Sequence, residues 1–553
     1  MSLPSTIRSH VDPAAVTKVT RLFNNTLTDI LSELIQNARR AGATRVELTT
    51  SIIDDTTWLT VADDGVGIAD PSVLLALGKS GWGDDVVARE DPAGMGVYSL
   101  AGRSVEISSR APSGAQGWTI AIPPEAWENG TPIAVEPCDM PTGTRIRFPL
   151  TAPSPIRLSG DARAAARYCP VPVSLDGIAL GREDFLDGAD VVVERDGVRI
   201  GLFRSPHTRH FSTSINFHGV VVGCMLPSVA ERDRHWAVRV DIVDAPHLAL
   251  VLPARKEMVE NAALDQLRQT IRQAIYAHIR TLGNHSLNFT SWHEAADLGI
   301  RLPEARPELR AWQPRFSDTN SGNDSKAIAV HAAAIIVDAF TIGIEQSAAL
   351  ALADDSRFAG RLVGTDYGMI GYSWYDSLPN IIDLQFTFDA DGETYVYDED
   401  TAPDVESGVV ENLALTVRLA SGGAEADYRL PARGAVVYDD DRYCVEEARI
   451  IIAERGALKP EELVDLLDAI CFCASDDKES DSWDTQHDSF LADAREIATT
   501  FLFGEDEALI ERMRNIIAFR AQWLVPPGRR LTVSITSDAV DVALAPFAPA
   551  APG

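Results

Sequence analysis

A strand that ends in an acidic, glycine-rich turn constrains the fold of this chain more than any other feature of its sequence. The strand-like segment Thr57–Ala62 leads into Asp63–Ile68, which reads DDGVGI. Glycines at alternate positions allow a sharp turn and a close approach of backbone to a ligand. At the end of the strand, the Asp63 carboxylate can accept a hydrogen bond from an exocyclic amine such as that of adenine. An ordinary Asp/Gly turn is the alternative.

A helix-forming segment, Asp29–Gly42, carries a second signal. Glu33 and Asn37 are four residues apart and share one face of the expected helix, while apolar residues pack beneath. A carboxylate beside a carboxamide offers a base for water and a neutral oxygen for a hard cation such as magnesium. A solvated helix can also show this pair, so the spacing has little specificity by itself.

Two further segments suggest contacts with phosphate. Asp91–Ala101 is a glycine-rich loop that leads into a helix, and free N–H groups at a helix start bind phosphate. Leu77–Asp84 before it has the glycine hinges of a mobile lid. Its Gly-Lys-Ser triplet is not a Walker A motif, because Val73 stands where that motif needs its first glycine. The segment Thr142–Phe148 is a turn that leads into a strand, with a hydroxyl-bearing residue where the strand begins.

The hydrophobic pattern predicts an α+β protein with several domains. A helix over Thr17–Gly42 precedes expected strands at Arg45–Ile53, Thr57–Ala62, Ser104–Arg110, Gly117–Ile122 and Thr144–Leu150. We therefore expect a layered α+β domain over residues 1–155. Residues 156–300 form a second mixed α/β domain, which ends in a helix with apolar residues on one face, namely Leu264, Leu267, Ile271, Ile275 and Leu282.

The rest of the chain has a weaker pattern. Residues 301–325 are the expected linker, since Leu302–Asn323 is rich in helix and strand breakers. Residues 326–553 form a C-terminal α+β region of unknown fold. It begins with a helix over Lys326–Leu352, and strands, more helices and a final strand over Leu531–Leu544 follow.

Composition narrows the class of partner and the compartment. The 553 residues carry 49 Lys and Arg against 81 Asp and Glu, a formal charge of −32. This balance disfavours a nucleic-acid partner without excluding one, since a basic groove can lie inside an acidic molecule. Met1–Thr6 lacks signal-peptide features, and six cysteines without a CxxC pair suit the cytoplasm. Ala327–Ile344 is apolar but includes His331 and Asp338, which favours a core helix over a membrane span.

Two local patterns in the C-terminal half leave alternatives open. Asp376–Glu406 holds ten acidic residues and no Lys or Arg. Such a run is a solvated face or a docking surface for a basic partner. Cys471 and Cys473 are a close pair, which fits the apolar face of a short helix better than a metal site, because no second ligand pair stands nearby.

Together, in this order and spacing, the four N-terminal motifs resemble those of the GHKL, or Bergerat-fold, ATPases. This superfamily includes type II topoisomerases, the ninety-kilodalton heat-shock chaperones, sensor histidine kinases and MutL-type repair proteins. Glu33–Ala38 is similar to the N box, Asp63–Gly67 to the DxGxG box, Gly94–Gly96 to the second glycine box and Thr142–Thr144 to the closing Gly-Thr element. The resemblance implies an N-terminal Bergerat-fold α/β sandwich that binds ATP and Mg2+.

The resemblance also implies residue roles. Glu33 would activate the attacking water, Asn37 would hold Mg2+ on the triphosphate, and Asp63 would receive the adenine amine. Thr144 would support the hydrogen bonds of Asp63 and adenine. The other implied nucleotide-binding positions are Gly65, Gly67, Ile68, Lys79, Ser80, Gly94, Met95, Gly96 and Val97.

A further match lies in the second domain. Val243–Glu260 resembles the chaperones' middle, transducer-like segment, whose cation reaches the γ-phosphate. Lys256 takes that position, with Arg255 as a substitute; the alternative is a basic residue that solvates a helix start. The resemblance covers about residues 17–283. Sensor kinases fit poorly, because in this chain the ATP-binding motifs come first.

These observations predict a slow, Mg-dependent ATPase that works as a chaperone-like homodimeric clamp, with hydrolysis gated by docking of the middle domain. Its acidic C-terminal half would bind a protein client or partner, and no membrane is involved. One alternative is a signalling or anti-phage defence ATPase whose C-terminal half senses a partner or nucleic acid. The other is a module that binds ATP without hydrolysing it.

Overall fold

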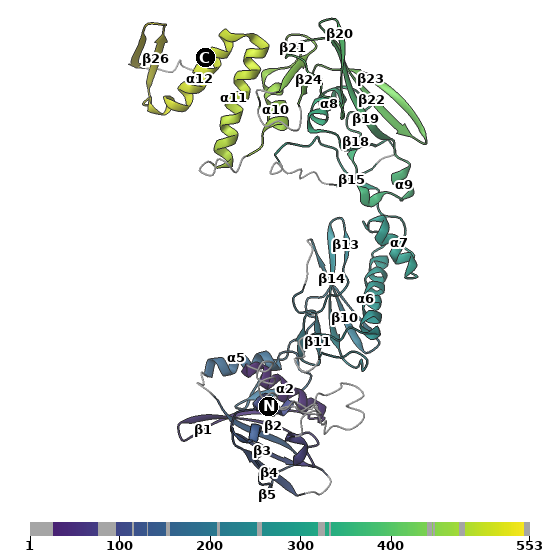
Figure 1. Cartoon of the computed structure of the whole chain (residues 1–553), viewed down its shortest axis with the longest axis vertical. Helices are drawn as coiled ribbons and strands as arrows, with labels where there is room; N and C mark the ends of the chain where they lie inside the picture. The colour runs from purple at the N-terminus through teal and green to yellow at the C-terminus, as the bar shows by residue number, and fades with distance from the viewer. Residues whose placement is uncertain are drawn as a thin grey trace, which may run out of the picture. The chain divides into compact units, whose positions relative to one another are not determined.

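The computed structural model has a mixed α+β architecture with several sheets, and it divides into two compact units, Met1–Ala305 and Arg306–Gly553 (Figure 1). The structure describes residues 26–75, 96–112, 116–129, 131–150, 155–206, 211–251, 257–318, 327–330, 333–438, 445, 448–474 and 482–546.

An eight-stranded sheet forms the first layer of the first unit, in the order β5-β4-β3-β6-β2-β1-β7-β8. Its strands are β1 (Val46–Ile53), β2 (Thr56–Asp63), β3 (Val105–Arg110), β4 (Gly117–Ile122), β5 (Glu136–Cys138), β6 (Gly143–Pro149), β7 (Val173–Leu175) and β8 (Ile178–Ala179). Neighbouring strands are antiparallel except β1 and β7, which run parallel. The five strands predicted from hydrophobic alternation are confirmed.

Helix α2 (Leu27–Arg40) packs its apolar side into the core of this sheet. Thr26 and Asp29 form a capping box at its start, which satisfies backbone groups that a helix end leaves open. Helix α5 (Pro155–Ala166) packs beside α2, and the shared core continues to Leu175. Shorter elements complete the layer: η1 (Pro71–Leu75), η2 (Gly96–Leu100) and α4 (Ala126–Asn129).

The second sheet of this unit has the order β12-β11-β14-β10-β9, with β13 paired to β14. Its strands are β9 (Val191–Arg195), β10 (Val198–Ser205), β11 (Ile215–Phe217), β12 (Val220–Val222), β13 (Val229–Glu231) and β14 (Arg234–Ile242). Helices α6 (Ala262–Thr281) and α7 (Phe289–Asp297) share its core. Four predicted apolar positions of α6 are buried. Leu282 was placed wrongly, because it caps the helix and stays 39% exposed.

The second unit contains a six-stranded sheet, a three-stranded sheet of β21, β25 and β24, and a two-stranded sheet of β15 and β16. A C-terminal hairpin and several helices complete it. Its strands before the C-terminal region are β15 (Glu308–Arg310), β16 (Ala327–Ala329), β17 (Ile335–Val337), β18 (Leu362–Gly364), β19 (Asn380–Ala390), β20 (Glu393–Tyr397), β21 (Gly408–Val409), β22 (Glu411–Ser421), β23 (Ala424–Pro431), β24 (Gly434–Val437) and β25 (Arg449–Ile452). Its first helices are α8 (Ile342–Asp354), η3 (Tyr367–Met369) and α9 (Ser373–Asp376).

The predicted helix over Lys326–Leu352 is wrong in its first half. Strands β16 and β17 come first, and α8 begins only at Ile342. The β-branched run Ile335–Val337 is buried between β18 and β19, where branched side chains pack well. A short apolar run does not distinguish a buried strand from a buried helix by periodicity.

The C-terminal region consists of helices α10 (Pro460–Cys471), α11 (Trp483–Phe503) and α12 (Glu505–Arg520), then η6 (Gln522–Leu524) and a hairpin. The predicted single strand is wrong here, because β26 (Arg529–Ile535) and β27 (Val540–Pro546) reverse direction at Thr536. Cys471 ends α10 in a buried position, and burial raises its pKa to about 12. Cys473 is exposed.

Candidate functional site

Three adjacent strands place polar side chains next to one another at one end of the first sheet. In the strand register, Asp63 of β2 lies opposite Thr144 of β6, and Thr144 lies opposite Ser109 of β3. The hydroxyl oxygens of Ser109 and Thr144 are 3.1 Å apart. The DxGxG turn and the Gly-Thr element therefore meet in the fold, although about 80 residues separate them in the sequence.

Ser109 is a residue of the candidate site that the sequence analysis did not identify. Its side chain is 0% exposed; Oγ accepts a hydrogen bond from the Ile68 backbone at 2.8 Å and donates one to the Gly143 carbonyl at 2.8 Å. One hydroxyl thus connects two motifs. The sequence does contain a sign of this role. Val105, Ile107 and Ser109 are alternate residues of one strand and share its buried side, and Ser109 is the polar residue at the end of that row.

The Asp63 carboxylate is held by backbone hydrogen bonds. Its Oδ1 accepts a hydrogen bond from the Gly65 N–H at 2.9 Å. Burial raises the pKa of Asp63 above its ordinary value of 3.8, and the backbone hydrogen bonds of Gly65 and Thr144 partly oppose that shift. A partly buried carboxylate at a strand end can accept a hydrogen bond from a ligand amine.

Three glycines of the site are required by close backbone contacts. A Cβ on Gly67, which has φ +65°, would lie 2.2 Å from the Arg110 carbonyl oxygen. A Cβ on Gly143, with φ +133°, would lie 2.1 Å from the Asp63 carbonyl oxygen, and one on Gly65 would lie 2.7 Å from Ala41 Cβ. No side chain fits in these places, so the turn needs glycine at these positions.

The end of α2 is fastened to the same turn. The Val66 N–H donates to the Ala41 carbonyl at 2.9 Å. Glu33 and Asn37 lie upstream on α2, both partly buried. The Asn37 Oδ1 accepts a hydrogen bond from Arg40 Nη1 at 3.2 Å, and the Glu33 Oε2 is shielded from solvent. The structure therefore brings the C-terminal end of α2 against the turn that follows Asp63.

Several predicted site residues lie outside the described part of the chain: Lys79, Ser80, Gly94, Met95, Arg255 and Lys256. Gly96 and Val97 open η2, which packs against α2. The described end of the glycine loop is thus a 3-10 helix of five residues rather than an α-helix. The Tyr98 hydroxyl anchors η2 by donating to the Leu75 carbonyl at 2.7 Å.

Helix α2 also contacts the second sheet of its unit. The Gln36 side chain is 3% exposed, and its amide nitrogen donates to the carbonyl of His218 in the turn between β11 and β12. A Cβ on Gly219 in this turn would lie 3.1 Å from Cys169 Cα, so the turn packs tightly against a residue of the first sheet's core. The residue beside Asn37 in the N box therefore connects the two sheets.

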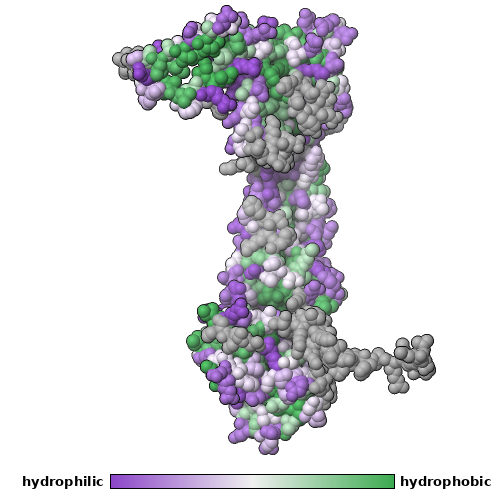
Figure 2. All heavy atoms as spheres, turned by 60° about the vertical axis from the view of Figure 1, so that its left-hand side comes forward, coloured by the Kyte–Doolittle hydropathy of each residue, from purple (hydrophilic) through white to green (hydrophobic). Residues whose placement is uncertain are grey.

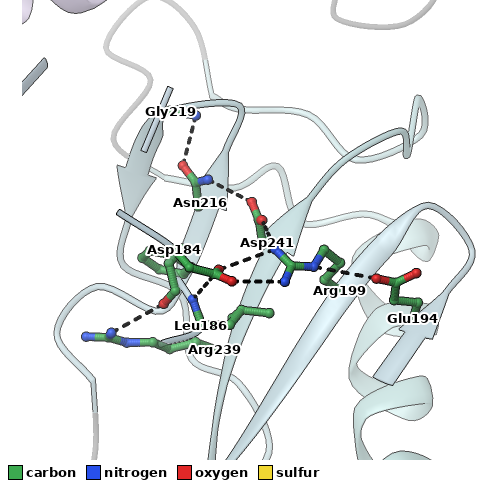
Figure 3. A network of polar contacts seen from close by, with 9 residues as sticks. Asp184, Leu186, Glu194, Arg199, Asn216, Gly219, Arg239 and Asp241 are labelled. Atoms are coloured by element: carbon green, nitrogen blue, oxygen red, sulfur yellow. Dashed lines mark hydrogen bonds and ion pairs between the residues drawn. The ribbon is translucent and has the colours of Figure 1, made fainter. Parts of the chain in front are cut away.

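A polar network within the second sheet supports the turn between β11 and β12 (Figure 3). The Gly219 N–H donates to Asn216 Oδ1 at 2.8 Å, and Asn216 donates to Asp241 Oδ1 at 2.7 Å. Arg199 bonds to Asp241 at 3.1 Å and to Asp184 at 3.1 Å. The Arg199 guanidinium lowers the pKa of Asp184, which keeps that carboxylate ionised. Charge-assisted bonds of this kind are strong, so the turn has a rigid support.

Comparisons with protein-family models and with curated proteins found no match to this chain. Across the described residues, none of the helices is long and apolar enough to cross a membrane. The same part of the chain holds no group of three or more His, Cys, Asp or Glu side chains that could bind a metal.

Proposed function

We propose that this chain is a Mg-dependent ATPase of GHKL type that acts as a slow, chaperone-like clamp. The observation that carries the proposal is the partly buried Asp63 carboxylate, which lies opposite Thr144 in the strand register and accepts a hydrogen bond from Gly65, in a turn whose glycines leave no space for a Cβ. This combination supplies a hydrogen-bond acceptor at the end of a strand, where glycines allow a ligand to approach the backbone closely. An adenine amine fits such a site.

The nucleotide's other parts would meet residues of α2 and η2. Mg2+ in nucleotide sites is commonly held by one or two protein oxygens together with substrate phosphates. The Asn37 amide oxygen suits that need, and ATP with Mg2+ would supply the phosphate oxygens. The Glu33 carboxylate, whose Oε2 is shielded from solvent, would take the proton of the attacking water. Gly96 and Val97 at the start of η2 would donate N–H groups to phosphate.

The contact between Gln36 and His218 supports gating by the second domain. A shift of α2 on nucleotide binding would displace a turn that Asn216, Asp241 and Arg199 hold in place. In this proposal Lys256, with Arg255 as substitute, completes the site from the second domain. Homodimer formation and a protein client at the acidic C-terminal half are the associated partner proposals.

A matched pair of variants tests nucleotide binding. Asp63→Asn should abolish ATP binding in calorimetry, because an amide can turn a donor toward the adenine amine. Asp64→Asn is the control, since the neighbouring Asp64 accepts from Thr44 and Arg45 on the surface instead. We expect it to bind ATP like the wild type. Equal affinities for the two variants would remove Asp63 from the site.

Hydrolysis is tested with Glu33→Ala. We expect ATP binding to persist while phosphate release falls by at least about a hundredfold, the usual size of a lost general base. Omitting Mg2+ should have a comparable effect on turnover in the wild-type protein. Stimulation by an unfolded protein rather than by DNA would support the chaperone-like class. Turnover that survives Glu33→Ala would contradict the assignment of the base.

A further inference from the structure

The edge strand of the second sheet in the first unit borders a cavity. In the described part of the chain, β9 ends the strand order and pairs with β10 alone. The cavity measures about 500 Å³ and lies between β9, the C-terminal half of α6 and the residues that follow α7. Cavities of roughly this size are typical of sites for small organic ligands.

The walls of this cavity are largely apolar. Val191 and Val193 alternate on one face of β9, and in the strand register they lie opposite buried core residues of β10. Ala274 and Ala277 of α6 have short side chains, which leave space between the helix and the edge strand. Six apolar residues line the cavity, namely Val191, Val193, Ala274, Ala277, Leu298 and Ile300.

Three longer polar side chains also line the cavity, those of Arg195, Gln273 and Arg280. Arg195 continues the alternation of Val191 and Val193 along β9. Gln273 and Arg280 are about two helical turns apart on the same face of α6. Within the described residues, none of these three side chains has a hydrogen bond or an ion pair. Each of them can therefore bind a ligand.

The acidic residues next to this cavity have other partners. Glu194 points to the opposite face of β9, where its carboxylate lies 3.6 Å from Arg199 Nε (Figure 3). Asp190, just before β9, has its carboxylate 3.7 Å from Arg204 Nε. Among the residues that the structure describes, the cavity lining includes neither Asp nor Glu. In a chain with a formal charge of −32, two arginines without acidic partners at one cavity favour an anionic ligand.

A neutral histidine forms part of the wall. The His278 ring packs edge-on against Trp236, with the ring centroids 5.0 Å apart. Burial lowers the pKa of His278 below its ordinary value of 6.5, so the imidazole is uncharged at neutral pH. The positive charge among the described lining residues therefore comes from the two arginines.

A cavity of this kind differs from the apolar residues scattered over the surface. On the face drawn in Figure 2, hydrophobic residues of the first unit lie in small patches among hydrophilic ones. Such scattering is ordinary for a protein surface. A concave apolar space with a few convergent polar groups is instead the usual form of a small-molecule site.

We propose that this cavity binds a small amphipathic organic anion, with its apolar body between α6 and β9 and its oxyanion group at the rim, where Arg195 and Arg280 supply positive charge. Both arginines are exposed, as an oxyanion group at the rim requires. A guanidinium fork matches the oxygens of a carboxylate or a phosphate, and the Gln273 amide can donate a further hydrogen bond. The cavity shares no residue with the candidate ATP site, so the two proposals can fail separately.

Calorimetry of the full chain without nucleotide tests the class of ligand. The probes share an octyl-length chain and differ in their headgroup: octanoate, octyl phosphate, 1-octanol and octylammonium. We expect saturable binding of an anion with a dissociation constant below about 1 mM, at least about tenfold weaker binding of 1-octanol, and none of octylammonium. Tighter binding of either anion than of 1-octanol supports the proposal. Equal binding of both anions and 1-octanol, or no saturable binding of either anion at millimolar concentration, would overturn it.

Charge variants tie the binding to this cavity. Arg195→Gln combined with Arg280→Gln should weaken the tighter-binding anion by about tenfold or more and leave 1-octanol unchanged, because only charge-assisted contacts are lost. Arg163→Gln combined with Arg301→Gln is the matched control, since both of these arginines are exposed and lie outside the cavity lining. The control should bind the anion like the wild type. Equal affinities of the two double variants would contradict the proposed site.

A third variant fills the cavity without removing a charge. In Ala277→Leu the added carbons should occupy the space of the ligand's body, so binding of both the anion and 1-octanol should fall by at least about tenfold. Thermal unfolding checks that the variant is folded. A folded Ala277→Leu chain that binds both probes like the wild type would place the binding elsewhere and overturn the proposal.

Discussion

Replacing Ser109 with alanine tests whether one buried hydroxyl holds the candidate site together. The hydroxyl bonds to the Ile68 N–H and the Gly143 carbonyl, both at 2.8 Å, in a position that solvent does not reach. Alanine removes both bonds and offers no replacement. Since a buried polar group left without a partner costs about 1–3 kcal/mol, we expect the free energy of unfolding of the first unit to fall by about 2 kcal/mol.

Thermal unfolding of the full chain measures this loss. In a unit of this size 1 kcal/mol corresponds to about 2–4 °C, so the midpoint of the first unit should fall by about 4–8 °C. Ser108→Ala is the matched control. Its hydroxyl lies 2.9 Å from that of Thr119 in a partly buried position, and its loss should cost less than about 1 kcal/mol.

Nucleotide titration separates a role in the site from a role in stability alone. The Ser109 hydroxyl is 3.1 Å from that of Thr144, which lies opposite Asp63 in the strand register. We expect Ser109→Ala to weaken ATP binding about tenfold at a temperature where the protein is folded, which is about 1.4 kcal/mol. Equal midpoints and equal affinities for Ser108→Ala and Ser109→Ala would refute the reasoning.

Three further predictions follow from the same geometry. Because burial raises the pKa of Asp63, this carboxyl stabilises the fold at a pH below its unfolded pKa, and that contribution is lost as the pH rises through its folded pKa. ATP affinity should rise over the same acidic range, because the ionised carboxylate is the form that accepts the hydrogen bond. Titrations of stability and affinity against pH, with Asp63→Asn as control, should show these opposite trends. Gln36→Met removes the donor to His218 and should slow hydrolysis at least about fivefold with ATP affinity little changed, and unaltered phosphate release would make the contact purely structural. Lys256→Ala should leave ATP affinity within a few-fold and slow hydrolysis by about tenfold, and combining it with Arg255→Ala tests for compensation.

Local pattern was enough to predict the strands that build the candidate site. Residues Val105 and Ile107 alternate with polar neighbours, and the turn at Asp54 separates β1 from β2 as its composition indicates. The glycine positions followed from turn chemistry, and the close approaches of Gly67 and Gly143 give their physical reason. These features are local, so the sequence contains them directly.

Features that depend on tertiary partners were not predictable in this way. The contacts of Ser109 come from the turn at Ile68 and from Gly143 of β6, which lie 41 and 34 positions away in the sequence. The strand Ile335–Val337 is determined by its neighbours β18 and β19 rather than by its own period. The contact of Gln36 with His218 joins residues 182 positions apart, and a polar residue within a helix gives no sign of it.

Helix α2 is the element through which a nucleotide could act on the second sheet. Its end bonds to the DxGxG turn through Ala41 and Val66, and its middle bonds to the β11–β12 turn through Gln36. A rigid helix that shifts at one contact must strain the other unless the second sheet follows. The β11–β12 turn cannot yield alone, because Asn216 binds both Gly219 and the buried Asp241, and Arg199 secures Asp241. Under the proposed function, movement of α2 is therefore passed to the whole sheet, and the energetic coupling has a defined physical route.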